Sequence, residues 1–346
     1  MDLNGIVSPH HGAIVFEFSP EHFGGERFTA VKEEIEILFI VKHFYKGKDF
    51  RFDLTERQQC DIRGSCPGFV AALTVDDDLF TGFQGTGIGL PVSNADEVGT
   101  VEFKNVSFVY PEAQEEAISD ISFRIEKGQT LAIIGATGCG KTTLISLIAR
   151  FYDATKGEVL VDGVNVKDYT FDGLYNKIGY ITQKAVLFAG SIRENITFGE
   201  SKEAFDEATV DMAIELSQAK EFVEKTEDGK EHRIVQLGKN VSGGQKQRLS
   251  IARALARKPE ILIFDDSFSA LDYKTDAALR HGLSKELSDT TKVIVAQRIS
   301  TIRDADKIIV LERGEAVGIG THEELMESCE VYREIAQSQL TAAELS

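Results

Sequence analysis

A glycine-rich stretch at residues 135–142 carries the clearest chemical signal in the sequence. It reads GATGCGKT and fits the pattern G-x-x-x-x-G-K-[ST] at every position. Glycines allow successive backbone N–H groups to line a concave anion site, and a helix that starts directly after the loop adds partial positive charge. We expect Lys141 to reach the β- and γ-phosphates of a nucleotide and Thr142 to ligate Mg²⁺. The predicted cofactor-binding residues here are Gly135, Ala136, Thr137, Gly138, Cys139, Gly140, Lys141, Thr142 and Thr143.

A second apolar stretch supplies a carboxylate that suits the metal side of such a site. Residues 261–265 read ILIFD, a buried-strand pattern that ends in Asp265. A carboxylate in this context is the expected partner of Thr142 at Mg²⁺. Such a strand alone is common, and the glycine-rich loop alone could be a turn without function. The two together predict a nucleoside triphosphate site.

The elements that position these residues alternate along the chain from about residue 100. Residues 130–134 (TLAII) predict a buried strand before the loop, and residues 141–151 predict a helix after it. Short apolar strands separated by helical patterns predict an α/β domain with a largely parallel sheet. We also expect an edge strand from Val101 to Phe108, a hairpin at residues 158–166 with Asp162 and Gly163 at its turn, strands at 178–182, 260–264, 292–296 and 307–311, and helices at 205–225, 244–257 and 273–287.

Length and charge limit the classes of protein that fit. The chain has 346 residues and a formal net charge of −18, which disfavours a broad nucleic-acid-binding face, so we expect no nucleic-acid partner. The longest apolar run, residues 35–41, is far shorter than the roughly 20 residues that cross a bilayer. No secretory signal is visible, and the 4 cysteines form no CxxC pair, which fits a reducing cytosol.

A change in composition near residues 94–99 predicts two parts, residues 1–99 and 100–340. The first part is acidic and rich in Phe, and we interpret it as a segment of unknown fold, a small α+β unit or a poorly ordered stretch. Residues 85–90 (GTGIGL) are faintly similar to the ATP lid of sensor histidine kinases, but the asparagine-bearing helix of that fold is missing. We therefore expect no second ATP site. We expect Cys60 and Cys66 to be free thiols, and His10, His11, His22 and His43 lack metal-ligand spacing.

Along the sequence, residues 241–245 (VSGGQ) lie between the glycine-rich loop and the strand that ends in Asp265, and the residues KQR follow them. With these motifs in this order, residues 100–340 resemble the nucleotide-binding domain of an ABC transporter, although Val241 stands where the family usually has Leu. The resemblance implies a P-loop NTPase (RecA-like) parallel sheet core, an antiparallel β subdomain and a helical subdomain. Residues 186–199 (VLFAGSIRENITFG) resemble the exporter branch of this family.

The resemblance implies roles for further residues. Tyr110 occupies the position of an aromatic ring that stacks on adenine, although a packing role is the alternative. Gln183 matches a loop that senses Mg²⁺ and contacts the transmembrane partner, and residues 269–272 (SALD) match a loop at the dimer interface. In this family two domains pair head to tail, so that ATP on one domain meets a helix start on the other. The implied γ-phosphate ligands on that helix are Ser242, Gly243, Gly244 and Gln245, and the implied metal residues are Thr142, Gln183 and Asp265.

Two positions depart from the pattern of the hydrolytic family members. Asp266 stands where the family has Glu, and Gln297 stands where it has His. The shorter side chain sets the carboxylate back by roughly 1.5 Å, and a misplacement near 1 Å can cost on the order of 10²-fold in rate. A glutamine amide can donate a hydrogen bond but carries no positive charge. With Gln183, these are the predicted catalytic residues, and we expect weak ATP hydrolysis at this site.

These departures predict the degenerate half of a heterodimeric exporter. On this hypothesis the chain is an ATP-binding subunit, detached from its permease and peripheral at the cytoplasmic face of the membrane. It would hold MgATP and complete the active site of a second, different nucleotide-binding domain. The alternatives are a slow homodimer with Asp266 as base, a non-hydrolysing regulatory or scaffold protein, a soluble ABC ATPase acting on DNA or ribosomes, and a rearranged or truncated gene product.

Cys139 lies inside the glycine-rich loop at a predicted helix start, which favours the thiolate form. We therefore expect alkylating agents to block ATP binding and bound ATP to protect the thiol. The alternative is an inert small residue. Cys329, in a C-terminal helical pattern, is expected to be a packing residue.

Overall fold

The computed structural model describes residues 97–199 and 205–340, together with four two-residue strands nearer the N-terminus. The chain divides into two units, Met1–Gln84 and Gly85–Ser346. In the first unit β1 (Ile6–Val7) pairs antiparallel with β2 (Ile14–Val15), and β3 (Phe28–Thr29) pairs antiparallel with β4 (Gln59–Cys60). The following expectations lie outside the described residues: the fold of the N-terminal segment, the thiols of Cys60 and Cys66, the four N-terminal histidines and residues 85–90.

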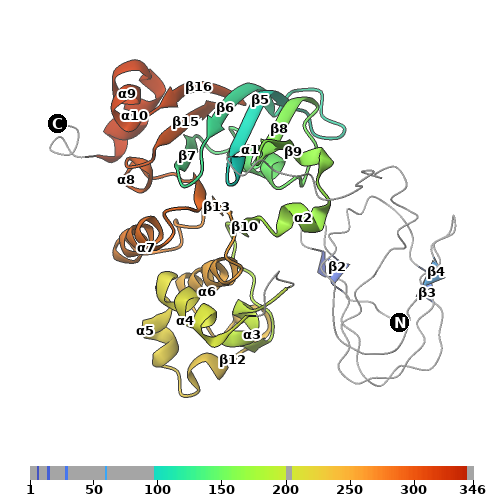
Figure 1. The fold of residues 1–346 in the computed structure, drawn as a ribbon, viewed down its shortest axis with the longest axis vertical. Helices are drawn as coiled ribbons and strands as arrows, with labels where there is room; N and C mark the ends of the chain where they lie inside the picture. The colour runs from blue at the N-terminus through green and yellow to red at the C-terminus, as the bar shows by residue number, and fades with distance from the viewer. Residues whose placement is uncertain are drawn as a thin grey trace. The chain divides into compact units, whose positions relative to one another are not determined.

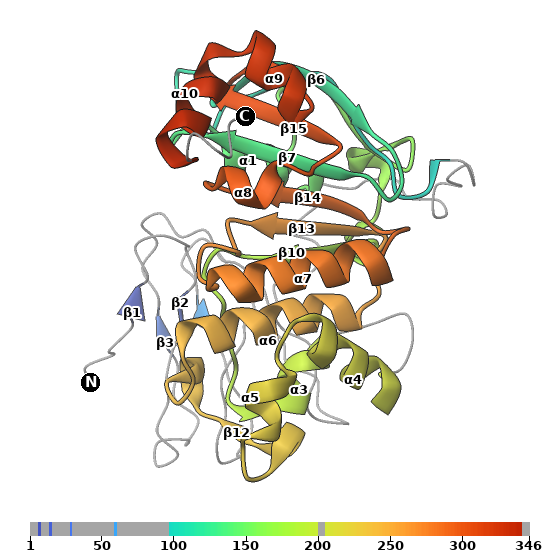
Figure 2. The same cartoon turned by 90° about the vertical axis from the view of Figure 1, so that its left-hand side faces the viewer.

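The centre of the second unit is a six-stranded sheet with the order β10-β13-β14-β7-β15-β16. Figure 2 shows β15, β7, β14, β13 and β10 side by side in this order. These five strands are parallel, and β16 pairs antiparallel with β15. The predicted parallel sheet is therefore confirmed. The bounds are β7 (Thr130–Gly135), β10 (Ile178–Ile181), β13 (Ile261–Asp265), β14 (Thr291–Val295), β15 (Lys307–Glu312) and β16 (Glu315–Gly320).

Alternate residues of the central strands serve two hydrophobic cores, because successive side chains of a strand point to opposite faces. Leu131 and Ile133 pack in one core with helix α1 and the antiparallel sheet. Ala132 and Ile134 pack in the other core with the remaining long helices. A parallel sheet covered on both faces explains why its strands read as nearly continuous apolar runs. The helices that cover it are α1 (Lys141–Ile148), α7 (Tyr273–Glu286), α8 (Ile299–Ile302), α9 (His322–Ser328) and α10 (Glu330–Gln339).

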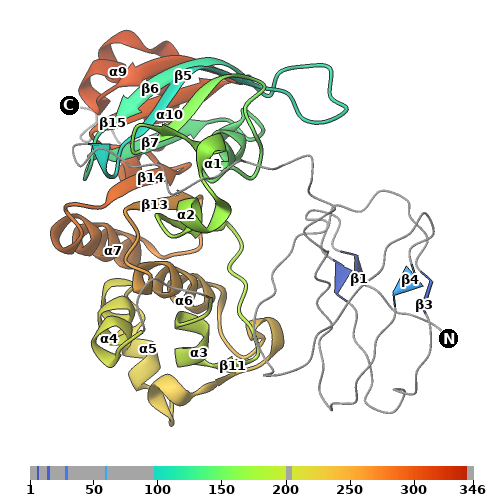
Figure 3. The ribbon, with the colours of Figure 1, turned by 45° about the vertical axis from the view of Figure 1, so that its right-hand side comes forward.

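A four-stranded antiparallel sheet has the order β6-β5-β8-β9 and forms a second layer (Figure 3). Its strands are β5 (Val101–Phe108), β6 (Ile118–Ile125), β8 (Lys156–Val161) and β9 (Val164–Asn165). The expected edge position of β5 is wrong, because β5 lies between β6 and β8. Its broken alternation comes from an irregularity at Asn105, where φ is 48° and the pairing register shifts. The predicted hairpin turn is confirmed, with φ of 53° at Asp162 and 73° at Gly163.

The helical part of the unit contains α3 (Ile192–Ile196), α4 (Glu207–Leu216), α5 (Lys220–Glu224) and α6 (Gly243–Ala256), with β11 (Gly190–Ser191) paired to β12 (Arg233–Ile234) (Figure 1). The single helix expected at residues 205–225 is wrong. Gln218 adopts a left-handed conformation with φ of 60°, which ends α4 before α5 begins. A short helix, α2 (Phe171–Tyr175), precedes β10. Within residues 97–199 and 205–340, every helix is too short or too polar to cross a lipid bilayer.

A network of ion pairs and hydrogen bonds joins the antiparallel sheet to the amino ends of the central strands. The buried Asp162 accepts a 2.7 Å hydrogen bond from the Gly99 N–H and pairs with Lys177 Nζ at 2.6 Å. Lys177 also pairs with Glu260 at 2.8 Å, and the Thr291 hydroxyl donates a 2.5 Å bond to the Gly99 carbonyl. A buried carboxylate requires such partners. Lys177 and Glu260 precede β10 and β13, and Thr291 begins β14, so these contacts lie at the amino ends of the parallel strands.

Candidate nucleotide-binding site

The glycine-rich loop connects the carboxyl end of β7 to the first turn of α1, where the sequence predicts it. Gly135 has a φ of 153°, and a Cβ there would lie 2.1 Å from the Leu311 carbonyl oxygen and 2.7 Å from Cys139 Sγ. Gly140 caps α1 in the left-handed conformation, with φ of 103°. Only glycine combines these conformations with this close backbone approach. The loop therefore has the backbone geometry that a phosphate cradle requires.

Lys141 folds back over this loop. Its ammonium donates hydrogen bonds to the carbonyl oxygens of Gly135 at 2.8 Å and Ala136 at 2.7 Å, and to Cys139 Sγ at 3.7 Å. The charge is thus held at the mouth of the loop by weak carbonyl acceptors. A phosphate is a stronger acceptor for an ammonium than a carbonyl is, because the bond joins two full charges. The arrangement fits a triphosphate in the loop.

Two hydroxyl groups hold the Asp265 carboxylate at the end of β13. Thr142 Oγ1 donates to Oδ1 at 2.9 Å, and the Tyr180 hydroxyl donates to Oδ2 at 3.3 Å. Burial raises the pKa of Asp265 above its ordinary value, while these two hydrogen bonds act in the opposite direction. A hydroxyl and a carboxylate are hard oxygen ligands of the kind that Mg²⁺ prefers. Thr142 and Asp265 therefore fit the metal role expected from the sequence.

Asp266 receives two amides on one carboxylate oxygen. Gln183 Nε2 donates to Oδ2 at 3.0 Å, and Gln297 Nε2 donates to the same oxygen at 2.7 Å. Asp266 is buried, adopts a φ of 47°, and is tied to β14 through a 3.1 Å bond from its N–H to the Val295 carbonyl. The structure thus brings together the three residues predicted to be catalytic. Both amides are neutral donors, so the only charge in this group is the carboxylate itself.

Tyr110 lies at the edge of the loop helix with its ring among other aromatic side chains. Its hydroxyl is 2.8 Å from Thr143 Oγ1. Its ring packs edge-to-face against Phe108 and Tyr152, with distances between ring centroids of 4.8 and 5.2 Å. These contacts show the packing role directly. Its stacking on adenine stays a prediction.

Ser242 caps helix α6 in the helical part, whereas the phosphate loop belongs to the central sheet. Ser242 Oγ accepts from the Gln245 N–H at 3.3 Å, and Gln245 Oε1 accepts from the Ser242 N–H at 2.8 Å. Ser242 and Gly243 are exposed, and a Cβ on Gly243 would meet no atom within 4 Å. The start of a 14-residue helix is therefore open to a ligand brought by another molecule.

Cys139 is buried, with 6% of its surface exposed. Thiol reactivity requires access as well as thiolate character. The burial therefore favours the alternative, an inert small residue, over an alkylation-sensitive thiol. Cys329 is also buried, as expected for a packing residue.

The segment that resembles the exporter branch is fastened to α6 by Arg253. This guanidinium donates to the carbonyl oxygens of Asn195 at 2.7 Å and Val186 at 3.0 Å, and it packs on the rings of Phe188 and Phe198. Burial lowers the pKa of Arg253 to about 10. Since Ser242 caps the start of α6, the open helix start and this segment belong to one packed body.

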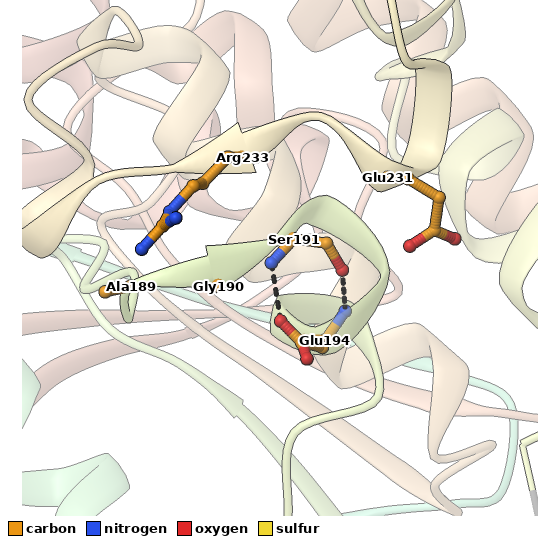
Figure 4. Close-up of a pocket in the computed structure, with 6 residues that line it drawn as sticks. All are labelled: Ala189, Gly190, Ser191, Glu194, Glu231 and Arg233. Carbon is orange, nitrogen blue, oxygen red and sulfur yellow. Dashed lines mark hydrogen bonds between the residues drawn. The ribbon is translucent and has the colours of Figure 1, made fainter. Parts of the chain in front are cut away.

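A surface pocket is lined in part by this segment and is distinct from the phosphate loop (Figure 4). Ser191 and Glu194 form a reciprocal cap there, with bonds of 2.6 and 3.1 Å between side chain and backbone (Figure 4). The remaining lining residues are Ala189, Gly190, Glu231 and Arg233. None of these lining residues belongs to the phosphate loop, so this pocket is not the candidate nucleotide site.

Sequence reasoning missed one residue of the metal side, Tyr180. A faint signal was present, because a tyrosine within the apolar strand 178–181 needs a partner for its hydroxyl when it is buried. Its partner, Asp265, is on the neighbouring strand β13. The pairing of β10 with β13 had to be known before this contact could be expected.

A parallel sheet with a glycine-rich phosphate loop and a strand-end aspartate defines a P-loop nucleotide-binding domain. Residues 118–269 match the family model of the ABC transporter. The chain is 44% identical over 246 residues to the uncharacterized ABC transporter ATP-binding protein Rv1273c of Mycobacterium tuberculosis, a match that covers 71% of this chain and 42% of the relative. It is 43% identical over 247 residues to multidrug resistance protein 1 of Entamoeba histolytica, covering 70% of this chain and 19% of the relative.

A solved structure of a bacterial Atm1-family ABC exporter with ATP bound superposes with a TM-score of 0.67 at 34% identity, covering 72% of this chain and 43% of that one. The matched part of the chain is therefore an ABC transporter ATP-binding domain of the exporter type. The chain spans about two fifths of the length of Rv1273c and of this exporter, and about one fifth of the Entamoeba protein.

Proposed function

We propose that the chain is the ATP-binding component of an exporter-type ABC transporter, and that its own site holds MgATP with weak hydrolysis. The arrangement of Asp266 carries this proposal. The aspartate stands at the position of the hydrolytic carboxylate, and Gln183 and Gln297 both bind its Oδ2. A general base must reach the proton of the attacking water, and a shorter carboxylate restrained by two amides is poorly placed to do so.

Binding of the nucleotide is assigned to the loop and to the first turn of α1. Lys141 exchanges its bonds to the Gly135 and Ala136 carbonyls for bonds to the β- and γ-phosphates, and the loop N–H groups hold the phosphate oxygens. Thr142 and Asp265 would hold Mg²⁺ together with Gln183, which is bound to the adjacent Asp266. When bound, the ion neutralises phosphate charge. The ring of Tyr110 lies against adenine.

The open start of α6 is assigned to a second nucleotide-binding domain. Ser242 and the N–H groups of Gly243 and Gly244 bind the γ-phosphate of ATP held by that domain, so ATP joins the two domains head to tail. Because this surface is intact while the chain's own hydrolytic carboxylate is Asp, we assign the second domain to a different subunit that carries Glu and His. A transmembrane permease completes the assembly at the cytoplasmic face of the membrane, and the two domains close and open it.

The proposal is tested with the purified full chain. Equilibrium dialysis should show MgATP binding, and phosphate release should be slow with the chain alone. Lys141→Ala should abolish binding; unchanged binding would overturn the nucleotide assignment. Robust turnover by the chain alone that disappears in Asp266→Asn would instead support a homodimer that uses Asp266 as base and contradict the weak-site assignment. With a candidate partner domain present, Ser242→Ala should lower hydrolysis at the partner's site and leave ATP binding to this chain unchanged.

A further inference from the structure

The side chain of Gln339, at the end of α10, holds the backbone next to Gln297. Its Oε1 accepts a 2.9 Å hydrogen bond from the Ile299 N–H, and its Nε2 donates a 2.8 Å bond to the Gln297 carbonyl. One amide thus binds backbone groups on both sides of Arg298. The two partners lie 40 and 42 residues before Gln339 in the sequence.

The backbone at this point depends on an outside partner. Helix α8 has only 4 residues, and its cap, Arg298, makes no side-chain hydrogen bond to the first turn. The first N–H groups of a helix have no partner within the helix. Gln339 supplies one for Ile299, and its donor end fixes the carbonyl of Gln297. Helix α10 therefore restrains the path of the chain between β14 and α8.

Both neighbours of this segment are firmly anchored, so the restraint has a rigid origin. Tyr332 and Ala336 of α10 have 0% exposure in the core. At the other end of α8, Thr301 Oγ1 donates a 3.0 Å bond to Asp276 of α7. Asp276 has 0% exposure and also accepts a 2.8 Å bond from Arg280.

We propose that Gln339 is a positioning residue for the nucleotide site. By fixing the backbone of Gln297, it places the Gln297 amide within reach of Asp266 and, when ATP is bound, of the γ-phosphate. Gln339 acts through the backbone only and touches neither Asp266 nor the nucleotide. The part concerning the γ-phosphate rests on the proposed function, whereas the restraint on residues 297–299 does not.

Amide hydrogen exchange at Ile299, measured on the nucleotide-free full chain, tests the restraint. Gln339→Ala should speed exchange at Ile299 by about fivefold or more, because one net hydrogen bond is lost. Gln337→Ala is the matched control, since Gln337 is exposed on the same helix, and it should leave the rate unchanged. Equal rates in all three proteins would overturn the inference.

The ratio of ATP to ADP affinity tests the positioning role. Gln339→Ala should weaken ATP binding by about fivefold and leave ADP binding unchanged, because ADP has no γ-phosphate for Gln297 to reach. Gln339→Glu keeps the acceptor for Ile299 and loses the donor to Gln297. Its affinity for ATP should therefore lie between that of the wild-type chain and that of Gln339→Ala. An unchanged ratio, or an equal loss for both nucleotides, would assign Gln339 a merely structural role. A wild-type chain that binds neither nucleotide would overturn the proposed function, and the exchange experiment would still decide the restraint.

Discussion

The side-chain amide of Gln297 lies 2.7 Å from Oδ2 of Asp266, the same oxygen that Gln183 binds at 3.0 Å. Residue 297 follows β14, residue 266 follows β13 and residue 183 follows β10. The ends of three neighbouring strands are therefore tied together at one carboxylate oxygen. The identity of residue 266 cannot change without altering both contacts.

We expect Asp266→Glu and Gln297→His to act together. Gln297 Nε2 already lies 2.7 Å from the Asp266 carboxylate, so we expect a side chain that is one methylene longer to crowd this amide and to raise ATP hydrolysis only slightly. With His at 297, hydrolysis should rise by more than the product of the two single effects, on the order of 10²-fold overall. Steady-state phosphate release from the four proteins of this cycle gives the coupling. Strictly multiplicative effects would show that the two positions act independently.

Tyr180→Phe should weaken the magnesium side of the site without disturbing the phosphate loop. The hydroxyl that donates to Asp265 Oδ2 is lost, and the ring that packs against Phe151 at 5.1 Å is kept. ATP affinity should fall about fivefold in the presence of Mg²⁺ and stay unchanged in excess EDTA. Tyr175→Phe, a change at an exposed position of α2, is the control. An equal change with and without Mg²⁺ would contradict this role for Tyr180.

A comparison of Gly135→Ala with Gly138→Ala separates the energetic cost of a positive φ from the cost of a steric clash of the added Cβ. Both glycines have positive φ, 153° and 82°, but a Cβ at Gly135 meets the Leu311 carbonyl at 2.1 Å, whereas a Cβ at Gly138 meets nothing within 4 Å. Gly138→Ala should lower the free energy of unfolding by about 1 kcal/mol. Gly135→Ala should cost clearly more and abolish ATP binding, as measured by chemical denaturation and dialysis. Similar costs for both would mean that the contact with Leu311 relaxes freely.

Acid should remove one surface contribution to stability. Hydrogen bonds from Arg193 and Lys230 lower the pKa of Glu207 from 4.5 to about 2. A lowered pKa in the folded state stabilises the fold above the unfolded value, and this contribution is lost as pH falls from about 4.5 through about 2. Glu207→Gln should therefore lower the melting temperature at pH 7, and the difference should shrink below pH 4.5. Glu224→Gln, another exposed change, should give no such pH-dependent difference.

The sequence was sufficient for features whose signal is local. The glycine pattern at residues 135–142 and the apolar runs of the central sheet predicted the loop, β7, β10, β13, β14 and β15, with ends shifted by about one residue. Features that depend on distant partners were missed or mistaken. Gln218 breaks a helix without a glycine to mark the break, and the neighbours of β5 decide that it is an interior strand.

The candidate site divides in the same way. Thr142 and Asp265 could be paired from their motifs, since the order of a phosphate loop and a strand-end carboxylate is informative by itself. The contacts of Tyr180 with Asp265 and of Gln339 with the backbone of residue 297 span 85 and 42 residues. Only the packing of strands and of α10 brings these groups together.

The contacts of Gly99 have a mechanical consequence. The phosphate loop lies at the carboxyl end of β7, whereas the contacts of Gly99 with Asp162 and Thr291 lie at the amino ends of the parallel strands. Tension applied to the chain at residue 99 therefore loads the beginning of β14 through Thr291, and the beginnings of β10 and β13 through Asp162, Lys177 and Glu260. Gly99 and the nucleotide site therefore lie at opposite ends of the parallel strands.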